Sequence, residues 1–420
     1  MSASTPLPGP LTSRTVAIDD PGDLIDLLPP GGISWIRRDE GLIAWGVAER
    51  FDGGGASRYT NANAWWRRLT RHAEVHDDLR MPGTGLISFG SFAFSDDSAS
   101  GGTMIVPQFV VGKRGDHAWL TQITRSPESS VPSLADALGK AVPVAPLGDV
   151  SIEAGDRETW NASVSSAVTR IVHGDVDKVV LARAVGAQAK HPIDVRAILR
   201  PLATDYPSCW TFHVDGLVGA TPELLARVDH GLVTSRVLAG TIRPTGDEVA
   251  DLAHAAALAR SSKDREEHGY AVRSVSEVLV NHCASMNVPE EPSVLHLPNV
   301  MHLATDVTGV LNHSATSLEL VSELHPSAAV CGTPTLAAAS VIGDLEDLDR
   351  GRYAGPVGWT NAAGDGEWCI GLRSAEINSE HPNRARLFAG CGIVAMSEPE
   401  SEWAESEAKL EAMRKAMGAL

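Results

Sequence analysis

Two ionisable residues have surroundings that suit acid–base chemistry. Lys178 opens the apolar run VVLARAV, and Glu223 follows Thr221-Pro222. A lysine serves as a general base when its amine is neutral, and a glutamic acid serves as a general acid when its carboxyl stays protonated. Each also has an ordinary interpretation. Lys178 would then be a strand-end lysine that reaches water, and Glu223 a first-turn carboxylate of a helix that starts at Pro222.

A second group of residues offers carboxylates to a hard cation. Asp264, Glu267 and His268 in SSKDREEH are spaced i, i+3, i+4, so they share one face of a helix expected over Asp247–Met286. Mg²⁺ prefers oxygen ligands and takes only one or two protein carboxylates, with water and substrate filling the other positions. The acidic segment SEPESEWAESEAKLE supplies more candidates, Glu405 among them. A solvated helix face is the alternative for both segments.

A third group could hold an anion. Arg373 lies in the apolar run EWCIGLRSAEI, which predicts a strand, and a charge buried there must be paired. Its partner is either a structural carboxylate or that of a ligand. Gly390 and Gly392 in AGCGIV permit close approach of the backbone, and Gly240-Thr241 in LAGTIRP offers donors at a turn.

The elements that must position these residues follow from patterning. Short apolar runs alternate with glycine-rich turns from residue 32 to about 125, which predicts antiparallel strands, a peripheral first strand at GGISWIRR and one helix at Ala64–Glu74. Residues 126–150 are a Pro/Ser-rich connection, and residues 1–31 are expected to be partly disordered. Further helices are predicted at Asp156–Gly174, Ser317–Leu324, Thr335–Leu348 and Glu402–Met417. Strands adjacent in sequence favour an α+β fold.

Composition excludes several classes of protein. The 420 residues, 43% apolar and 21% charged, are typical of a globular protein, without an apolar run that could span a membrane and without a secretory signal at the start. Five cysteines without C-x-x-C spacing predict reduced thiols in a cytoplasmic protein. A net charge of −18 argues against nucleic acid as a partner. An acidic protein that binds a small anion must supply a local cation, Arg or Lys.

A colinear series of motifs identifies a family. The segments are DKVVLAR, GATPELL, LAGTIRP, SSKDREEH, HLATDVTG, ELHPSAAVCGTP, DRGRYAGPVGWT, GDGEWCIGLR and AGCGIVAMSEPESEWAESEAK. Together they resemble the isochorismate synthases of the chorismate-utilising superfamily over roughly residues 155–420, the motif-bearing catalytic region. The resemblance implies one large domain over residues 32–420, built from two stacked antiparallel β-sheets flanked by helices. It also implies conversion of chorismate to isochorismate, in which water adds at C2 and the C4 hydroxyl departs.

The same resemblance assigns roles to matching positions. Lys178 corresponds to the general base, Glu223 to the general acid, and Glu267 and Glu405 to the carboxylates that hold Mg²⁺. The substrate-contacting positions are Gly240, Thr241, His302, Ala329, Val330, Tyr353, Arg373, Gly390 and Lys409.

Neighbouring activities are weighed from the same residues. Anthranilate synthases usually carry Gln where Lys178 stands, and aminodeoxychorismate synthases carry a nucleophilic Lys at the position of Ala239. Salicylate synthases keep the base and go on to eliminate pyruvate, so that activity is the first alternative. A catalytically silent chorismate-binding subunit is the second. Chorismate is the expected partner, without nucleic acid or membrane, in a monomer or weak homodimer that serves either menaquinone or siderophore biosynthesis.

Overall fold

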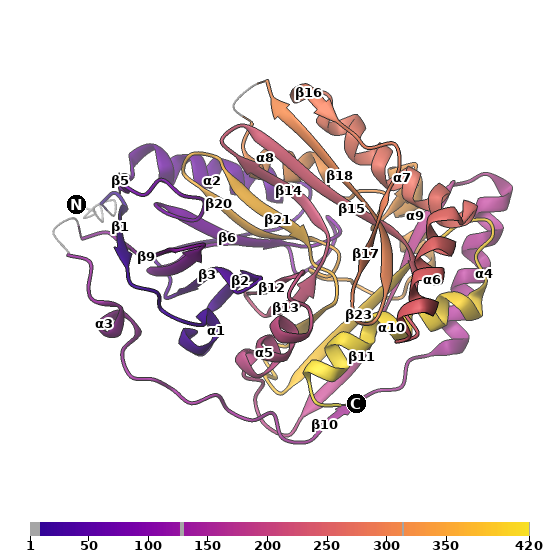
Figure 1. Cartoon of the computed structure of the whole chain (residues 1–420), viewed down its shortest axis with the longest axis horizontal. Helices are drawn as coiled ribbons and strands as arrows, with labels where there is room; N and C mark the ends of the chain where they lie inside the picture. The colour runs from indigo at the N-terminus through magenta and orange to yellow at the C-terminus, as the bar shows by residue number, and fades with distance from the viewer. Residues whose placement is uncertain (1–8, 127–129, 313–314, 420) are drawn as a thin grey trace, which may run out of the picture.

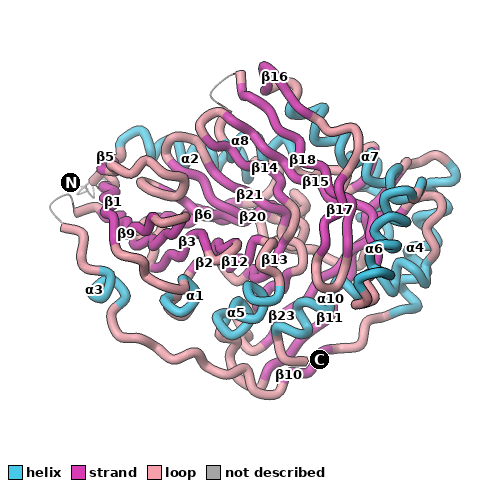
Figure 2. Tube along the Cα trace, viewed as in Figure 1, coloured by secondary structure: helices cyan, strands magenta, loops and turns pink. Residues whose placement is uncertain are grey.

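Two large sheets form the centre of the molecule. The computed structural model describes residues 9–126, 130–312 and 315–419, with strands in the middle and helices at the periphery (Figures 1 and 2). The first sheet has thirteen strands, in the order β10 (Val150–Ile152), β11 (Lys178–Ala189), β23 (Arg384–Ile393), β22 (Ser374–Ile377), β13 (Leu217–Thr221), β12 (Trp210–Val214), β2 (Ile33–Arg37), β3 (Glu40–Trp45), β8 (Phe109–Arg114), β9 (His117–Thr124), β1 (Thr12–Ile18) and β5 (Glu74–His76), with β19 (Gly332–Thr333) beside β11.

The second sheet has ten strands. Their order is β16 (Cys283–Asn287), β18 (Met301–Leu311), β15 (Leu232–Ile242), β14 (Leu224–Asp229), β21 (Gly366–Ile370), β20 (Pro356–Asn361), β6 (Ile87–Phe92), β7 (Gly102–Val106) and β4 (Glu49–Gly53), with β17 (Ser293–His296) beside β18. All strand pairs are antiparallel except the parallel pair β1–β5. The predicted α+β fold of two antiparallel sheets with flanking helices is confirmed.

Ten helices accompany the sheets in the described part of the chain. They are α1 (Leu24–Leu27), α2 (Arg58–His72), α3 (Leu134–Leu138), α4 (Arg157–His173), α5 (Val195–Asp205), α6 (Glu248–Arg260), α7 (Ser262–Leu279), α8 (Ser317–Leu324), α9 (Thr335–Leu345) and α10 (Pro399–Ala416). The prediction for α4 is confirmed by its caps, since Asp156 accepts a hydrogen bond from the Thr159 amide and Gly174 adopts the left-handed conformation. None of the described helices has the length and apolarity that a membrane crossing requires.

Several predicted boundaries were wrong. The helix expected over Asp247–Met286 is two helices and a strand, because Ser261 is extended and its hydroxyl caps α7 by accepting from the Asp264 amide. The helix expected at Ala64–Glu74 is α2, which begins at Arg58 and ends at His72. Residue periodicity locates a helix but not the residue at which the chain turns away from it.

The amino-terminal region also differs from expectation. β2, predicted as a peripheral strand, lies between β12 and β3 inside the first sheet. Within the segment expected to be partly disordered, Thr12–Ile18 form β1 and pair with both β9 and β5. Residues 1–8 lie outside the described residues. β2 is not an edge strand because β12 and β3 pair with it on its two sides.

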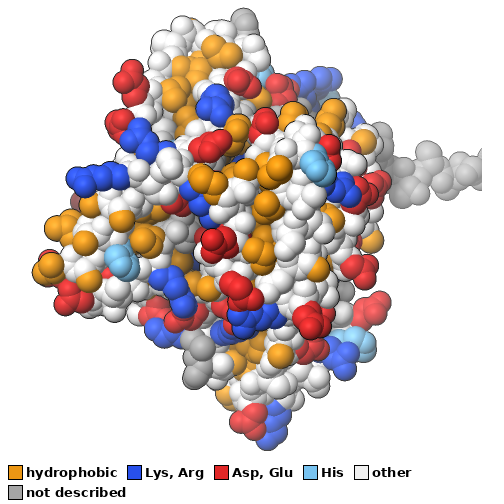
Figure 3. All heavy atoms as spheres, turned by 90° about the vertical axis from the view of Figure 1, so that its right-hand side faces the viewer, with side chains coloured by type: hydrophobic (Ala, Val, Ile, Leu, Met, Phe, Trp, Pro, Cys, Tyr) orange, Lys and Arg blue, Asp and Glu red, His pale blue; other side chains and the backbone are white. Residues whose placement is uncertain are grey.

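The surface is that of an ordinary globular protein. On the face shown in Figure 3, acidic and basic side chains are interspersed with scattered apolar ones.

The largest apolar cluster of the interior joins both sheets, with Leu181 and Phe388 from the first and Val237 and Trp368 from the second.

Two chain segments pass from one sheet to the other side by side, and we call them the connectors. In the first connector, Pro222–Glu223 leads from β13 of the first sheet to β14 of the second. In the second connector, Gly371–Arg373 leads from β21 of the second sheet back to β22 of the first. β13 pairs with β22 and β14 pairs with β21, so the connectors lie next to each other. The Ile370 amide donates to the Glu223 carbonyl at 3.2 Å.

We predict that Gly358→Ala destabilises the protein. A Cβ atom at this position in β20 would lie 2.1 Å from the Glu367 carbonyl oxygen and 2.7 Å from the Trp368 Cα, so the strands must separate. The expected loss in the free energy of unfolding is about 1–3 kcal/mol, measured by urea denaturation. Gly343→Ala is the control, because a Cβ there meets no described atom within 4 Å and alanine favours the helix. An equal free energy of unfolding in both variants would contradict this packing.

Candidate active site

A cavity lies beside the two connectors. Its walls come from β11 and β23 of the first sheet, β15 and β18 of the second, helices α7 and α10, and both connectors. A concave site in which a few polar and charged side chains converge among apolar ones is typical of small-molecule ligands.

Each connector carries one buried charged residue that lines the cavity, Glu223 in the first and Arg373 in the second. Glu223 was predicted at a helix start and Arg373 inside a single strand, and both predictions were wrong: each residue lies where the chain crosses between sheets. Glu223 is 5% and Arg373 7% exposed. Arg373 has a φ of 49°, an unfavourable conformation for a residue with a side chain. Such strain is often found at functional sites.

Burial controls the protonation of Glu223. Desolvation raises the pKa of its carboxyl to about 8, against the opposing fields of Lys178, Lys409 and Arg373. The carboxyl therefore holds its proton at neutral pH, because burial removes most of the solvent that would stabilise the carboxylate form and no described group donates a hydrogen bond to it. A protonated carboxyl in a cavity can act as a general acid.

Lys178, the first residue of β11, is fully buried. Its Nζ lies 3.3 Å from Glu267 Oε1 and makes no hydrogen bond within the described residues. Gly392 on β23 creates the space for this pair, because a Cβ there would lie 1.9 Å from Glu267 Oε1 and 3.0 Å from Lys178 Cε. Glu267 lines the cavity, whereas Lys178 lies immediately behind it. The pair is a buried amine and a carboxylate with room for few other atoms.

Arg373 is oriented by His302, whose side chain is 5% exposed. Arg373 Nη2 donates to His302 Nε2 at 2.9 Å, because a guanidinium can only donate. His302 Nδ1 therefore carries the proton and faces the Gly240 carbonyl and the Thr241 hydroxyl, both at 3.2 Å. Burial, with Arg373 and Lys409, holds the pKa of His302 well below its usual value. The imidazole is thus a neutral support that aims the guanidinium.

The remaining predicted residues line the same cavity. Gly240, at a φ of 75°, packs so close to Asp264 of α7 that a Cβ would lie 2.9 Å from the Asp264 Cβ. Lys409 Nζ donates to the Gly390 carbonyl at 2.8 Å. The other lining residues among the predictions are Thr241, Ala329, Val330 and Tyr353. His268, which shares a face with Glu267 by spacing, instead points into the core, where its Nε2 lies 2.7 Å from the Thr305 hydroxyl.

A carboxylate cluster borders the cavity on α10. Glu405 pairs with Lys409 at 2.6 Å, and Glu402 pairs with Lys263 at 2.9 Å. Burial alone would raise the pKa of Glu405, but Lys409 and Lys263 lower it below its usual value, so Glu405 is ionised. Burial and the neighbouring Glu405 raise the pKa of Glu402 to about 7. Sequence reasoning missed Glu402, although its i, i+3 spacing from Glu405 was a usable signal.

The donor set suits a hard divalent cation. Carboxylate oxygens of Glu402 and Glu405 lie within 4.8 Å of each other and of the Cys391 sulfur. Lys263 is held among these acids, and Glu402, Glu405 and Glu267 together raise its pKa against the effect of burial. An ammonium group at this position indicates that the acids need a counter-charge. Oxygen donors in such a cluster are those that Mg²⁺ prefers.

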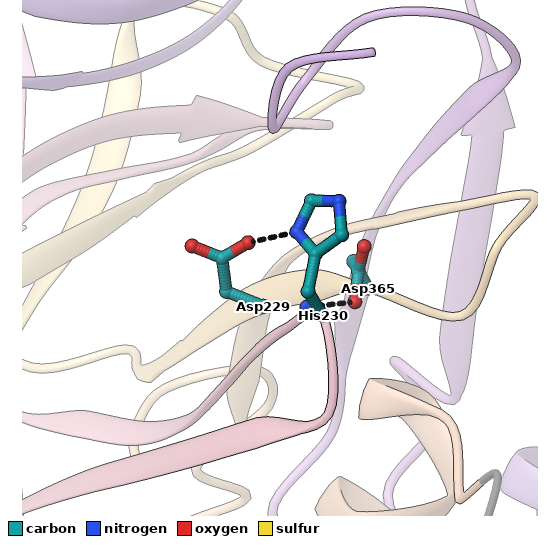
Figure 4. Close-up of side chains that lie close together, drawn as sticks. All are labelled: Asp229, His230 and Asp365. Carbon is teal, nitrogen blue, oxygen red and sulfur yellow. Dashed lines mark hydrogen bonds and ion pairs between the residues drawn. The ribbon is translucent and has the colours of Figure 1, made fainter.

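A second group of potential ligands lies elsewhere and has a structural explanation. Asp229, His230 and Asp365 lie close together at the β14–β15 turn (Figure 4). Asp365 accepts from the His230 amide at 2.9 Å, and Asp229 pairs with the His230 ring at 2.7 Å. His230 and Gly231 both have positive φ, so these carboxylates stabilise a tight hairpin turn.

The chain is similar in sequence to a known enzyme family and to individual proteins. A family model described as "Chorismate binding enzyme" matches residues 34–418. The chain is 38% identical over 273 residues to the isochorismate synthase DhbC of Bacillus subtilis, covering 62% of this chain and 68% of that one. It is 31% identical over 389 residues to the isochorismate synthase MenF of the same organism, covering 86% and 82%.

A solved structure agrees over nearly the whole chain. The menaquinone-specific isochorismate synthase MenF from Escherichia coli superposes with a TM-score of 0.80 at 26% identity, covering 97% of this chain and 95% of that one. The family resemblance predicted from the motifs is confirmed.

We predict that Glu223→Gln stabilises the protein more at high pH than at low pH. Glu223 has a usual pKa of 4.5 and a folded-state pKa of about 8. Between these values the folded chain holds a proton that the unfolded chain releases, so the stability of the native protein falls as pH rises. The amide removes this dependence. The difference in Tm, variant minus native, should increase by a few degrees from pH 5.5 to pH 8.5 in calorimetry. Glu290→Gln, at an exposed position, should give a constant difference.

Proposed function

The chain belongs to the chorismate binding enzyme family, and we propose that it converts chorismate to isochorismate. The observation that carries this proposal is that a buried amine, Lys178, and a buried protonated carboxyl, Glu223, both lie beside one cavity. The cations Arg373 and Lys409, which a dianionic substrate requires, line the same cavity. The reaction needs a base and an acid at the same pH, and burial keeps Glu223 in the protonated form that an acid requires.

The proposed chemistry balances without a covalent intermediate. Lys178 accepts a proton from the water whose oxygen bonds to C2 of the ring. The diene shifts, the C4–oxygen bond breaks, and Glu223 gives its proton to the departing hydroxyl, which leaves as water. Lys178 and Glu223 then return to their starting protonation states through solvent. One water enters and one leaves, so the reaction is an isomerisation.

The remaining residues bind and orient the substrate. We assign to Arg373, aimed by His302, the carboxylate of the enolpyruvyl group, with the backbone of Gly390 beside it. Gly240, Thr241 and Lys409 are assigned to the ring carboxylate. Ala329, Val330 and Tyr353 are assigned to the faces of the ring, and Tyr353 is held rigid by stacking on Phe388 at 4.9 Å.

We further propose that Glu267 and Glu405 hold Mg²⁺, with Glu402 assisting. Bound there, the ion would attract the ring carboxylate and withdraw charge from the reacting diene. Glu267 now pairs with Lys178. A cation held by Glu267 would take over this carboxylate and free the amine of Lys178 to face the attacking water.

We predict that Lys178→Ala and Glu223→Gln each lower kcat for chorismate by about 10²–10⁴, because each removes a proton-transfer group. Purified protein, chorismate and MgCl₂ are mixed and the products are separated by chromatography. Lys415→Ala is the control, because this lysine is exposed on the surface. The native protein should make isochorismate alone. Salicylate with pyruvate would replace the proposal by a salicylate synthase, and binding without turnover would replace it by a silent chorismate-binding subunit. Native rates in either variant would refute the assigned roles.

We predict that EDTA abolishes turnover and that excess Mg²⁺ restores it. Calorimetric titration of the metal-free protein with MgCl₂ should show weakened binding in Glu405→Gln, because one anionic ligand is lost. Glu400→Gln, on the same helix but exposed and paired with Arg157, should bind Mg²⁺ like the native protein. Turnover that is indifferent to chelation would refute the metal site.

A further inference from the structure

Between β19 and β10, which pair with the two ends of one edge of β11, side chains take the place of a neighbouring strand. The strand carries Lys178 at its start, and Val180 and Ala182 farther along line the cavity. Its other edge pairs continuously with β23, from Val179 to Gln188. On the edge in question, β19 pairs only with Lys178 and Val179. The cavity wall that continues from Lys178 therefore needs other partners for its backbone groups.

A buried ion pair supplies these partners. Arg350 Nη2 donates to the Val180 carbonyl at 2.7 Å, and Glu346 Oε1 accepts from the Ala182 amide at 2.7 Å. The amide of Val180, which precedes both of these groups along the strand, donates to the Cys331 carbonyl at 2.8 Å. Arg350 and Glu346 thus satisfy the backbone groups that a longer β19 would satisfy.

The same guanidinium also holds the facing loop. Arg350 Nη1 donates to the Val330 carbonyl at 3.0 Å, and Val330 lines the cavity. Glu346 receives the guanidinium in a two-pronged pair, at 2.9 Å from Nε and 2.5 Å from Nη2. The Phe94 ring lies 4.2 Å from the guanidinium carbon. Both charged side chains are at most 4% exposed, so the pair has little freedom to move.

We propose that Arg350, anchored by Glu346, is a positioning residue that fixes the distance between the strand of Lys178 and the Val330 loop. The inference rests on the proposed function, in which the substrate ring lies between these walls. Arg350 borders the cavity, but its donors point at four protein oxygens, so it has little left to offer a substrate carboxylate. Arginine suits this role because its fork is rigid, whereas lysine has one mobile ammonium.

The expected consequence concerns turnover more than binding. A displacement of about 1 Å between reacting groups can cost about 10²-fold in rate. Arg373 and Lys409, which attract the substrate, make their hydrogen bonds and ion pairs with described residues other than Arg350. Loss of Arg350 should therefore lower kcat while KM changes much less.

The test compares Arg350→Met with a matched buried arginine. Arg196 is 5% exposed, pairs with Asp194 in the same two-pronged way and donates to the carbonyls of Val142 and Pro143, but it lies outside the cavity. Both variants lose a buried ion pair, so both should lose stability. We expect kcat for chorismate to fall about 10–100-fold in Arg350→Met and to stay within twofold of native in Arg196→Met. Tm is measured for each by calorimetry, and rates are taken well below the lower Tm.

The outcomes separate the two proposals. A native protein without isochorismate production refutes the proposed function, whatever the variants do. With an active native protein, a kcat within twofold of native in Arg350→Met overturns the inference, as does an equal loss of kcat in Arg196→Met. A rise in KM with unchanged kcat overturns it too, because it would make Arg350 a binding residue. If Arg350→Met does not fold, kcat is measured in Glu346→Gln instead. This variant keeps the guanidinium of Arg350 but weakens the ion pair that holds it. A fivefold or larger fall in kcat supports the inference, and a smaller one overturns it.

Discussion

Exclusion of water from the Glu223 carboxyl is the interaction on which the site depends. Three cations, Lys178, Lys409 and Arg373, lie near enough to favour the ionised form, yet burial outweighs them and the pKa stays at about 8. The protein achieves this by giving the side chain no hydrogen-bond donor within the described residues, so the carboxylate would have little solvent and no partner. If a guanidinium donated a hydrogen bond to the Glu223 carboxylate, as Arg373 donates to His302, the bond would stabilise the negative charge and lower the pKa of Glu223.

The fold creates this buried position where two neighbouring chain segments cross from one sheet to the other. A side chain in the middle of a sheet points to one face or the other, but a residue at a crossing between sheets can point along the interface. Pro222–Glu223 and Gly371–Arg373 cross together, and pairing on both sides holds them in register. An acid and a guanidinium are therefore fixed at the junction of the sheets. The positive φ of Arg373 is the local cost of that turn, which the surrounding pairing sustains.

The sequence predicted which residues lie around the cavity better than it predicted the elements that carry them. Lys178, Glu267 and Glu405 stood out because charged residues of these types flank apolar runs or share helix faces. The crossings could not be found this way: EWCIGLRSAEI has the composition of one buried strand, and only tertiary pairing assigns its halves to different sheets. Thr221-Pro222-Glu223 matches a helix start, because proline is common at the first helical position, and only the tertiary pairing shows that the chain crosses between sheets here. Arg350 escaped notice because its position beside the cavity depends on backbone carbonyls of residues distant in sequence, those of Val330 and Val180.

The charges around the cavity give a reason for a metal that is independent of resemblance. Among the described residues, the basic side chains Lys178, Lys409 and Arg373 accompany the acidic side chains Glu267 and Glu405, while Glu223 is neutral and Glu402 pairs with Lys263. In the proposed mechanism Lys178 acts as a neutral base, which would leave only Lys409 and Arg373 to balance the two acidic side chains. A dianionic substrate would then enter a site without counter-charge inside a protein of net charge −18. We propose that a divalent cation at Glu267 and Glu405 would restore the balance, so that a neutral base and a bound metal would meet one electrostatic condition.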